Sequence, residues 1–433
     1  MDKNAAQDAP YSQKIGRGLD SKKEITLADK ANHFEEILRK RHVWEGFIRE
    51  LTLNVAGDPQ SGGVLHHNDN DGLWTSLYVA AMSFRYAATQ DQEAMRWASK
   101  SFHALEWLET ITGISGFPAR SIVKSGEPKK FKYDGEWHLD TFGKWEWKGD
   151  TSSDEIAGHF FAYSIYYDLV ADEEEKKRIR RIVSRIMDHI IEHQWYLVDA
   201  DGKPTRWGVW NPEQLNSNHL IHGLQDEDWH EECGLNSLLI LAHLKTAYHI
   251  TGQEKYQKKY FELIEKYGYA DNTVQLKITA PTGTVNHSDD ELAFCAYYPL
   301  LKYETDSKLR AIYHKSLDRT WKIERPERNP WWNFTYCVFI GEDCAIDDSI
   351  RTLRELSWEQ VNWRRENSIR KDVKIDPKNP TQGLDVLPYD QICIQRWNGN
   401  PYQLDTGGQG EIEGDGIVFL LPYWMGRYHQ LIR

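Results

Sequence analysis

The stretch DNDGLWTSLY, residues 69–78, joins a polar turn to a helix that is apolar on most of its faces. Aspartates are favoured at such a start, because their oxygens accept from unpaired backbone N–H groups and face the positive end of the helix dipole. A helix that is apolar all round is predicted to be buried. The pattern returns at Asp154, at Asp289–Glu291 and at Asp415–Gly416, so we expect several buried helices that begin on one side of the molecule.

Amphipathic helices are predicted between the buried ones. In the segment that ends near His193, for example, Ile179, Ile182, Ile186 and Ile190 share one face. Twelve helices then alternate in type, including predicted helices at 26–50 and 347–367 and a last one that ends at 432. Connections from a buried to an amphipathic helix are short, and most of the reverse connections are long.

This alternation predicts an all-α fold, an (α/α)6 toroid of inner and outer helices with the long loops on one rim. Any strands should be short hairpins within those loops. An open α-solenoid is the alternative, but the repeat lengths are too irregular for a simple stack. We expect residues 1–24 to be a polar lead-in and residues 25–433 to form one catalytic domain.

Composition narrows the classes of function. The net charge of -13 argues against a nucleic-acid partner, and no apolar run is long enough to cross a membrane. Eighteen tryptophans and 22 tyrosines suit a sugar-binding cleft, because flat amphipathic rings stack on the C–H faces of sugars. The five cysteines lack C-x-x-C spacing and are predicted to be free thiols.

The sequence says less about the cellular location and the oligomeric state of the protein. The N-terminal segment is polar, so no signal peptide is recognised, and the location stays open: without a removed signal peptide the protein is cytoplasmic. If a signal peptide was removed before Met1, the protein is periplasmic or secreted. The sequence leaves the oligomeric state open.

Acidic side chains gather at the predicted rim, where loops on a rigid scaffold usually carry function. Glycoside hydrolysis needs two carboxyl groups, one to protonate the leaving oxygen and one to activate water or attack the sugar. We predict Asp71 and Asp154 as the catalytic pair, with Asp290 in reserve. The alternative for each single aspartate is that it only caps its helix.

A second set of rim residues is predicted to bind the substrate. Arginines in the rim loops favour a uronic acid, because the guanidinium fork matches a carboxylate. The predicted binding residues are Asp69, Trp74, Arg120, Asp150, Glu155, His159, Arg206, Trp207, His230, His287, Trp331, Trp332, Asn333 and Tyr336.

No metal or cofactor is predicted. His219-x-x-His222 with His230 and Glu231 resembles part of a zinc site, and Asp69-x-Asp71-Gly72 resembles part of a calcium loop. Neither stretch has the complete ligand spacing.

Residues 25–433 resemble the (α/α)6 carbohydrate-active enzymes, nearest to unsaturated glucuronyl and rhamnogalacturonyl hydrolases and glucuronidase-type glycoside hydrolases. The likeness rests on Asp71-Gly72-Leu73-Trp74 and Asp154-Glu155-Ile156-Ala157, which head neighbouring inner helices. It implies that Asp154 is the acid/base, that Asp71 assists, and that aromatics with Arg120 and Arg206 hold a terminal uronic acid. The expected function is exo-acting hydrolysis of an oligosaccharide. The Ser152-Ser153 context and the long loop 114–153 depart from the family pattern.

Three alternatives remain at this stage. A polysaccharide lyase would remove a sugar proton by β-elimination, using Tyr336, His287, His159 or Asn333. A sugar epimerase of the same fold would need paired histidines, whose motifs are not matched here. A glycan-binding protein would need the aromatics but no acid with a raised pKa.

Overall fold

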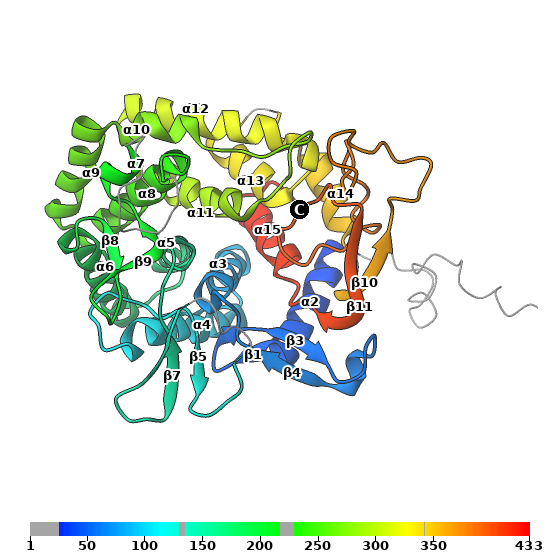
Figure 1. Ribbon diagram of the computed structural model, residues 1–433, viewed down its shortest axis with the longest axis horizontal. Helices are drawn as coiled ribbons and strands as arrows, with labels where there is room; N and C mark the ends of the chain where they lie inside the picture. Colours follow the sequence, from blue (N-terminus) through cyan, green and yellow to red (C-terminus); the bar gives the residue numbers. More distant parts are fainter. Residues whose placement is uncertain (1–25, 130–134, 217–228, 342) are drawn as a thin grey trace, which may run out of the picture.

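The computed structural model describes residues 26–129, 135–216, 229–341 and 343–433. Helices of two kinds alternate along the chain and form two concentric rings (Figure 1). The inner helices are α3 (Asp71–Thr89), α5 (Ser153–Leu169), α8 (Cys233–Thr251), α11 (Ser288–Tyr303), α13 (Pro330–Phe339) and α15 (Ile417–Tyr428). The outer helices are α2 (Leu27–Arg41), α4 (Gln92–Ile111), α6 (Glu173–Glu192), α9 (Glu254–Tyr267), α12 (Ser307–Glu324) and α14 (Ile346–Glu355).

The inner ring is closed. Helix α3 packs between α15 and α5, α8 packs between α5 and α11, and α13 packs between α11 and α15. Each inner helix is buried on nearly all sides, as an apolar helix must be. The (α/α)6 toroid predicted from the alternation is therefore confirmed.

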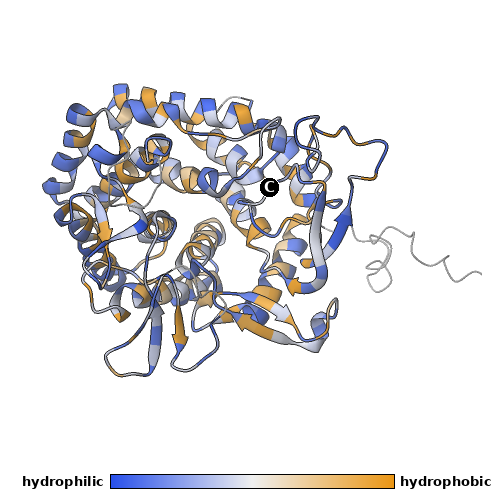
Figure 2. Cartoon of the chain, in the orientation of Figure 1, coloured by the Kyte–Doolittle hydropathy of each residue, from blue (hydrophilic) through white to orange (hydrophobic). Residues whose placement is uncertain are grey.

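The outer helices bury one face each. On α6 the side chains of Ile179, Ile182 and Ile186 are fully buried, and a capping box between Asp172 and Glu175 closes its first turn. Figure 2 shows the same two-sided character in α12, where hydrophilic and hydrophobic segments alternate along the helix. Burial of these faces against the inner ring holds the second layer in place.

Strands occur in the rim loops, as predicted. One four-stranded sheet has the order β10-β11-β3-β4 and joins a loop near the N-terminus to the last long loop. Its strands are β3 (Glu50–Leu53), β4 (Gly63–His66), β10 (Val361–Glu366) and β11 (Asp405–Glu413). The other strands are β1 (Val43–Trp44), β2 (Phe47–Ile48), β5 (Ile122–Lys124), β6 (Trp137–Leu139), β7 (Trp145–Lys148), β8 (Tyr196–Val198) and β9 (Pro204–Val209). Short helical turns complete the rim: α7 (Pro212–Leu215), α10 (Tyr269–Asn272), η1 (Pro59–Ser61), η2 (Thr273–Gln275) and η3 (Arg325–Glu327).

Several helix boundaries predicted from the sequence are wrong. The first helix ends at Arg41 instead of residue 50, because a tight turn at Gly46 (φ 97°) pairs β1 with β2. The helix predicted to reach residue 367 ends at Glu355, since residues 361–366 pair with β11. The last helix ends at Tyr428 instead of 432.

The cysteine prediction is wrong for one pair. Cys337 and Cys344 form a disulfide, with a Cα–Cα distance of 5.2 Å across the turn after α13. Cys233, Cys295 and Cys393 are free, as expected. The predicted lead-in at residues 1–24 lies outside the described residues. Within the described residues, none of the helices combines the length and the apolar character that crossing a membrane requires.

Candidate active site

A cavity of about 330 Å³ lies where the first turns of α3, α5 and α11 meet. Trp74 comes from α3, Asp154 from α5 and Glu291 from α11. Three residues that the sequence predicted for the site therefore meet here: Asp69, Trp74 and Asp154. The other lining residues are Asn68, Asn70, Leu73, Ser288, Arg396 and Asn398.

Glu291 is the most perturbed acid of the cavity. Its side chain is 2% exposed, and this burial raises its pKa to about 8, with a further contribution from the charge of Asp154. The guanidinium of Arg396 acts in the opposite direction but does not cancel the effect. Glu291 is therefore mostly protonated at neutral pH and can donate a proton.

Asp154 and Asp289 are the neighbouring acids. Asp154 is only partly buried, at the start of α5. Burial, helped by the charges of Glu232, Asp290 and Asp154, raises the pKa of Asp289 to about 7. The charge of Asp154 contributes to the raised pKa of both Asp289 and Glu291, so the acids of α5 and α11 interact electrostatically.

Trp74 and Arg396 form a flat wall of the cavity. The guanidinium carbon of Arg396 lies 3.8 Å from the centre of a Trp74 ring, which is a cation–π contact. Asp415 is 3.8 Å from the same guanidinium. Arg396 is the cation among the described residues that line this cavity, so it is the group placed to meet an anionic ligand.

Asp69 lines the cavity but is already paired. Its two oxygens lie 2.9 Å from Arg120 and 2.7 Å from Lys148, and both cations are buried. Burial alone would raise the pKa of Asp69, but the two cations outweigh it and lower the pKa. Arg120, predicted to bind the substrate, is held behind Asp69 and also donates to the Asp150 carbonyl at 2.6 Å.

Asp71, the other predicted catalytic residue, does not line the cavity. It is fully buried, and Oδ2 accepts from Arg49 at 2.8 and 3.1 Å while Oδ1 accepts from the Asn68 N–H at 2.6 Å. The structure thus places Asp71 in an ion pair that joins the start of α3 to Arg49, between β2 and β3.

Glu155 and His159 lie behind α3. Glu155 accepts from the Gly72 N–H at 3.1 Å, and its other oxygen is 3.4 Å from His159 Nε2. Burial raises the pKa of Glu155 well above its usual range and lowers that of His159 to about 3. Both side chains are therefore largely neutral and pack α5 against α3.

The Gly72→Ala variant is expected to be less stable than the wild type by about 1–3 kcal/mol, the usual effect of overpacking. A Cβ at this position would collide with a Glu155 oxygen and lie 2.6 Å from His159 Nε2. This clash outweighs the gain of about 1 kcal/mol in helix propensity. Chemical denaturation measures the difference, with Gly399→Ala as the control because its Cβ would meet nothing closer than 3.4 Å. Equal denaturation midpoints for Gly72→Ala and wild type would contradict the expectation.

Asp290 turns away from the cavity into a buried cluster. His287 Nδ1 is 2.7 Å from Asp290 and its Nε2 is 2.8 Å from Glu327. Burial opposes protonation of His287, but the two carboxylates outweigh it and raise its pKa to about 9. The reserve acid and His287 therefore belong to a separate site behind the first turn of α11.

The other predicted site residues do not line the cavity. Asp150 accepts from the Arg206 N–H at 2.8 Å, and the Arg206 guanidinium stacks on Trp207 at 4.4 Å. His230 is exposed at the rim and lies 3.1 Å from the Leu215 carbonyl. His219 and His222 fall outside the described residues. Four predicted residues are buried in the ring around α13: Trp331, Trp332, Asn333 and Tyr336.

The contacts of Tyr336 and Asn333 account for their burial. Tyr336 stacks on Trp321 with ring centres 3.7 Å apart and donates to Asp318 at 3.0 Å. Asn333 accepts from the Trp321 indole and donates to Ser349. The groups assigned to a lyase mechanism are thus parts of the core.

Sequence reasoning missed Glu291, Arg396 and Asn398 as site residues. Glu291 stands one position from the chosen Asp290, but neighbours on a helix point about 100° apart. Arg396 and Asn398 belong to the loop between β10 and β11, which has no periodic pattern. The signal for Glu291 was the run of three acids that opens α11.

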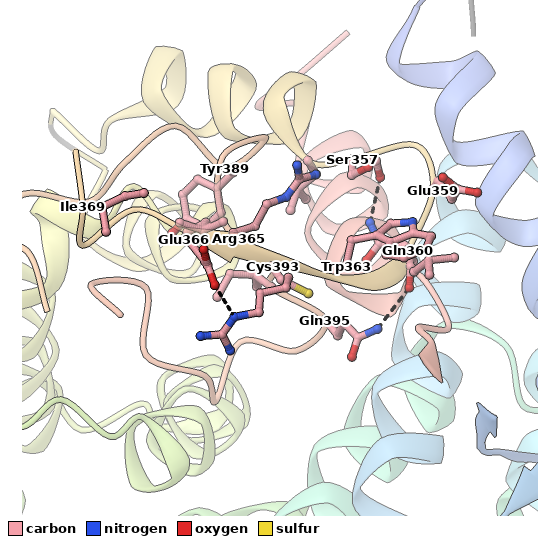
Figure 3. A pocket seen from close by; sticks show the side chains of 15 residues that line it. Ser357, Glu359, Gln360, Trp363, Arg365, Glu366, Ile369, Tyr389, Cys393 and Gln395 are labelled. Carbon is pink, nitrogen blue, oxygen red and sulfur yellow. Dashed lines mark hydrogen bonds and ion pairs between the residues drawn. The ribbon is translucent and has the colours of Figure 1, made fainter. Parts of the chain in front are cut away.

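A larger groove, of about 980 Å³, lies away from these acids (Figure 3). It runs along β10 and the segment 389–395, and its charged side chains include Arg364, which is 2.9 Å from Glu366. No acid from the first turns of α3, α5 or α11 lines it among the described residues. The smaller cavity in the ring therefore remains the candidate active site.

No protein-family model and no curated protein matches the chain. Solved structures with a similar fold include a glycoside hydrolase family 76 mannosidase from Bacteroides thetaiotaomicron, at 11% identity and a TM-score of 0.48, covering 94% of this chain and 100% of that one. They also include a polysaccharide lyase (10% identity, TM-score 0.43, covering 94% and 98%). A sugar epimerase from a ruminal bacterium matches at 13% identity and a TM-score of 0.44, covering 94% and 100%. At such identity, and with TM-scores below 0.5, these likenesses assign no activity to this chain.

Proposed function

We propose that the protein is a carbohydrate-active enzyme, specifically a glycoside hydrolase that cleaves an oligosaccharide in the cavity between α3, α5 and α11. The observation that carries this proposal is the pairing of two carboxyl groups in unlike surroundings. Glu291 is buried with a raised pKa, and Asp154 is partly exposed in the same cavity. Such a difference between two carboxyl groups is what assigns acid and base roles in glycoside hydrolysis.

The catalytic roles of Glu291 and Asp154 follow from how deeply each carboxyl group is buried. Protonated Glu291 donates its proton to the glycosidic oxygen as the C–O bond breaks. Asp154 acts on the other side of the sugar, as the base that activates water or as the nucleophile. Trp74, with the Arg396 guanidinium stacked on its ring, contributes apolar surface to the cavity wall. Asp154 stays a catalytic residue, but the proton-donor role expected for it from the sequence passes to Glu291, and Asp71 loses its assisting role.

The substrate class is a terminal uronic acid, and action is from the chain end. Arg396 supports this assignment, because its guanidinium lies in the cavity wall beside Glu291 and can pair with a sugar carboxylate. Arg396 also stacks on Trp74 and lies 3.8 Å from Asp415. It is preferred to Arg120 and Arg206 because it lines the cavity and they do not.

Product analysis tests the proposal. Wild type and Asp154→Asn are incubated with oligosaccharides that end in a uronic acid and with matched neutral oligosaccharides. We expect the wild type to release the terminal uronic acid and Asp154→Asn to lose at least about 100-fold in rate. Asp201→Asn, an exposed change in the β8–β9 turn, serves as the control.

Two outcomes would overturn the proposal. Ultraviolet-absorbing unsaturated ends on the products would identify a lyase instead. Binding of the oligosaccharides without any turnover would identify a glycan-binding protein. Release from neutral oligosaccharides alone would keep the hydrolase and reject the uronic acid.

A further inference from the structure

A buried cluster of ionisable side chains lies behind the first turn of α11, outside the candidate active site. His287 precedes α11, Asp290 is in its first turn, Glu324 ends α12, and Glu327 ends η3. All four residues are at most 2% exposed. One ligand atom from each of His287, Asp290 and Glu324 lies within 4.8 Å of the others.

Three oxygens of this cluster have no hydrogen-bond partner. They are Oδ1 of Asp290 and both carboxyl oxygens of Glu324, and all are buried. A buried polar atom without a partner costs about 1–3 kcal/mol, and more when it is charged. No ion pair involves Glu324 within the described part of the chain. The unpartnered oxygens therefore point to a missing cation or a missing proton.

The two ring nitrogens of His287 face different carboxylates. Its Nε2 lies 2.9 and 2.8 Å from the two oxygens of Glu327, while Nδ1 faces Asp290. A histidine that binds a metal through one nitrogen almost always donates the N–H of the other to a carboxylate or carbonyl. Glu327 supplies such a partner for Nε2, and Nδ1 lies 2.7 Å from Asp290, whose carboxylate belongs with Glu324 to the same group of ligand atoms.

We propose that His287 Nδ1, Asp290 and Glu324 bind one divalent transition-metal ion, of the zinc or manganese kind, with Glu327 orienting the histidine. One imidazole nitrogen with carboxylate oxygens is a donor set that such ions accept. The two positive charges of the ion would offset most of the negative charge of the three carboxylates around a single imidazole. It would also partner the three oxygens that otherwise have none.

The ion would have a structural task. It would tie the start of α11 to the end of α12, and the start of α11 also presents Ser288 and Glu291 to the active-site cavity. His287 and Asp290, which the sequence placed in the catalytic rim, would then support that rim from behind. This proposal does not depend on which sugar is cleaved.

Metal analysis of the full chain tests the site. Tag-free wild type, Glu324→Gln and the exposed control Glu265→Gln are produced in medium that contains zinc and manganese, and then dialysed. Elemental analysis is expected to find about one ion per chain in the wild type and in Glu265→Gln, because the buried site closes over the ion as the chain folds. Glu324→Gln is expected to retain at least about tenfold less.

A second measurement needs no variant. Prolonged treatment with a chelator should lower the melting temperature of the wild type, and adding zinc or manganese should restore it. Loading with Co²⁺ should give visible absorption bands from a nitrogen- and oxygen-ligated ion. If the wild type contains no ion and chelator leaves its melting temperature unchanged, a proton shared between Glu324 and Asp290 holds the cluster. Equal metal content in wild type and folded Glu324→Gln would place the ion elsewhere and also overturn the proposal.

Discussion

Replacing Glu291 with glutamine is expected to lower kcat by about 10²–10⁴-fold, the usual contribution of a general acid. Glutamine keeps the size and hydrogen-bonding groups of the side chain but has no proton to give to the leaving oxygen. Substrate binding should change little, because Trp74 and Arg396 stay in place. Steady-state kinetics measure kcat, and isothermal titration with a slowly cleaved substrate measures binding.

The pH profile adds a second test of the same residue. The proton of Glu291 must be present for catalysis, and its pKa is raised to about 8. The wild-type rate should therefore stay high below this pKa and fall as the pH rises through it. The residual rate of Glu291→Gln should lack this alkaline limb, and Glu265→Gln on the exposed face of α9 should keep it.

One result would reject the assignment of Glu291. It is a variant that is folded, as circular dichroism and thermal melting show, and retains nearly full kcat. In that case the neighbouring Asp289, whose pKa is raised to about 7, becomes the acid to examine next.

Removing the carboxylate of Asp71 is expected to destabilise the fold by about 3–5 kcal/mol, as breaking a buried ion pair typically does. Asp71→Ala leaves the Arg49 guanidinium buried without its carboxylate, near the Ile122 carbonyl at 2.5 Å and the Trp44 and Phe47 rings at 3.8 and 5.7 Å. It also removes the acceptor of the Asn68 N–H. The free energy of unfolding, measured by denaturant titration, gives the size of the effect.

Matched variants separate the ion pair from other causes. The double change Arg49→Met with Asp71→Asn removes both charges and keeps an acceptor for Asn68, so it should recover much of the lost stability. Asp201→Ala breaks an exposed pair with Lys203 and should change stability little. A folded Asp71→Asn that is fully stable but has lost its kcat would instead support the catalytic role predicted for Asp71 from the sequence.

The residues of the candidate site were predicted from the sequence only in part. Acids at the starts of buried helices correctly indicated a common rim, and Asp69, Trp74 and Asp154 do line one cavity. The sequence did not show which of several adjacent acids would line the cavity. On α11 the side chain of Glu291 lines the cavity, and Asp290 turns to His287. In the segment before α3, Asp69 lines the cavity, whereas Asp71, the first residue of α3, forms an ion pair with Arg49.

The sequence by itself determined the alternation of buried and amphipathic helices, and through it the toroid and the rim that carries the long loops. Those features depend on hydrophobic periodicity, which is local and repeats along the chain. Only the tertiary structure decided which acid of each run meets the cavity, because one residue of rotation moves a helical side chain by about 100°. It also decided the pKa of Glu291 and the cluster around His287, since burial and neighbouring charge come from helices far apart in sequence.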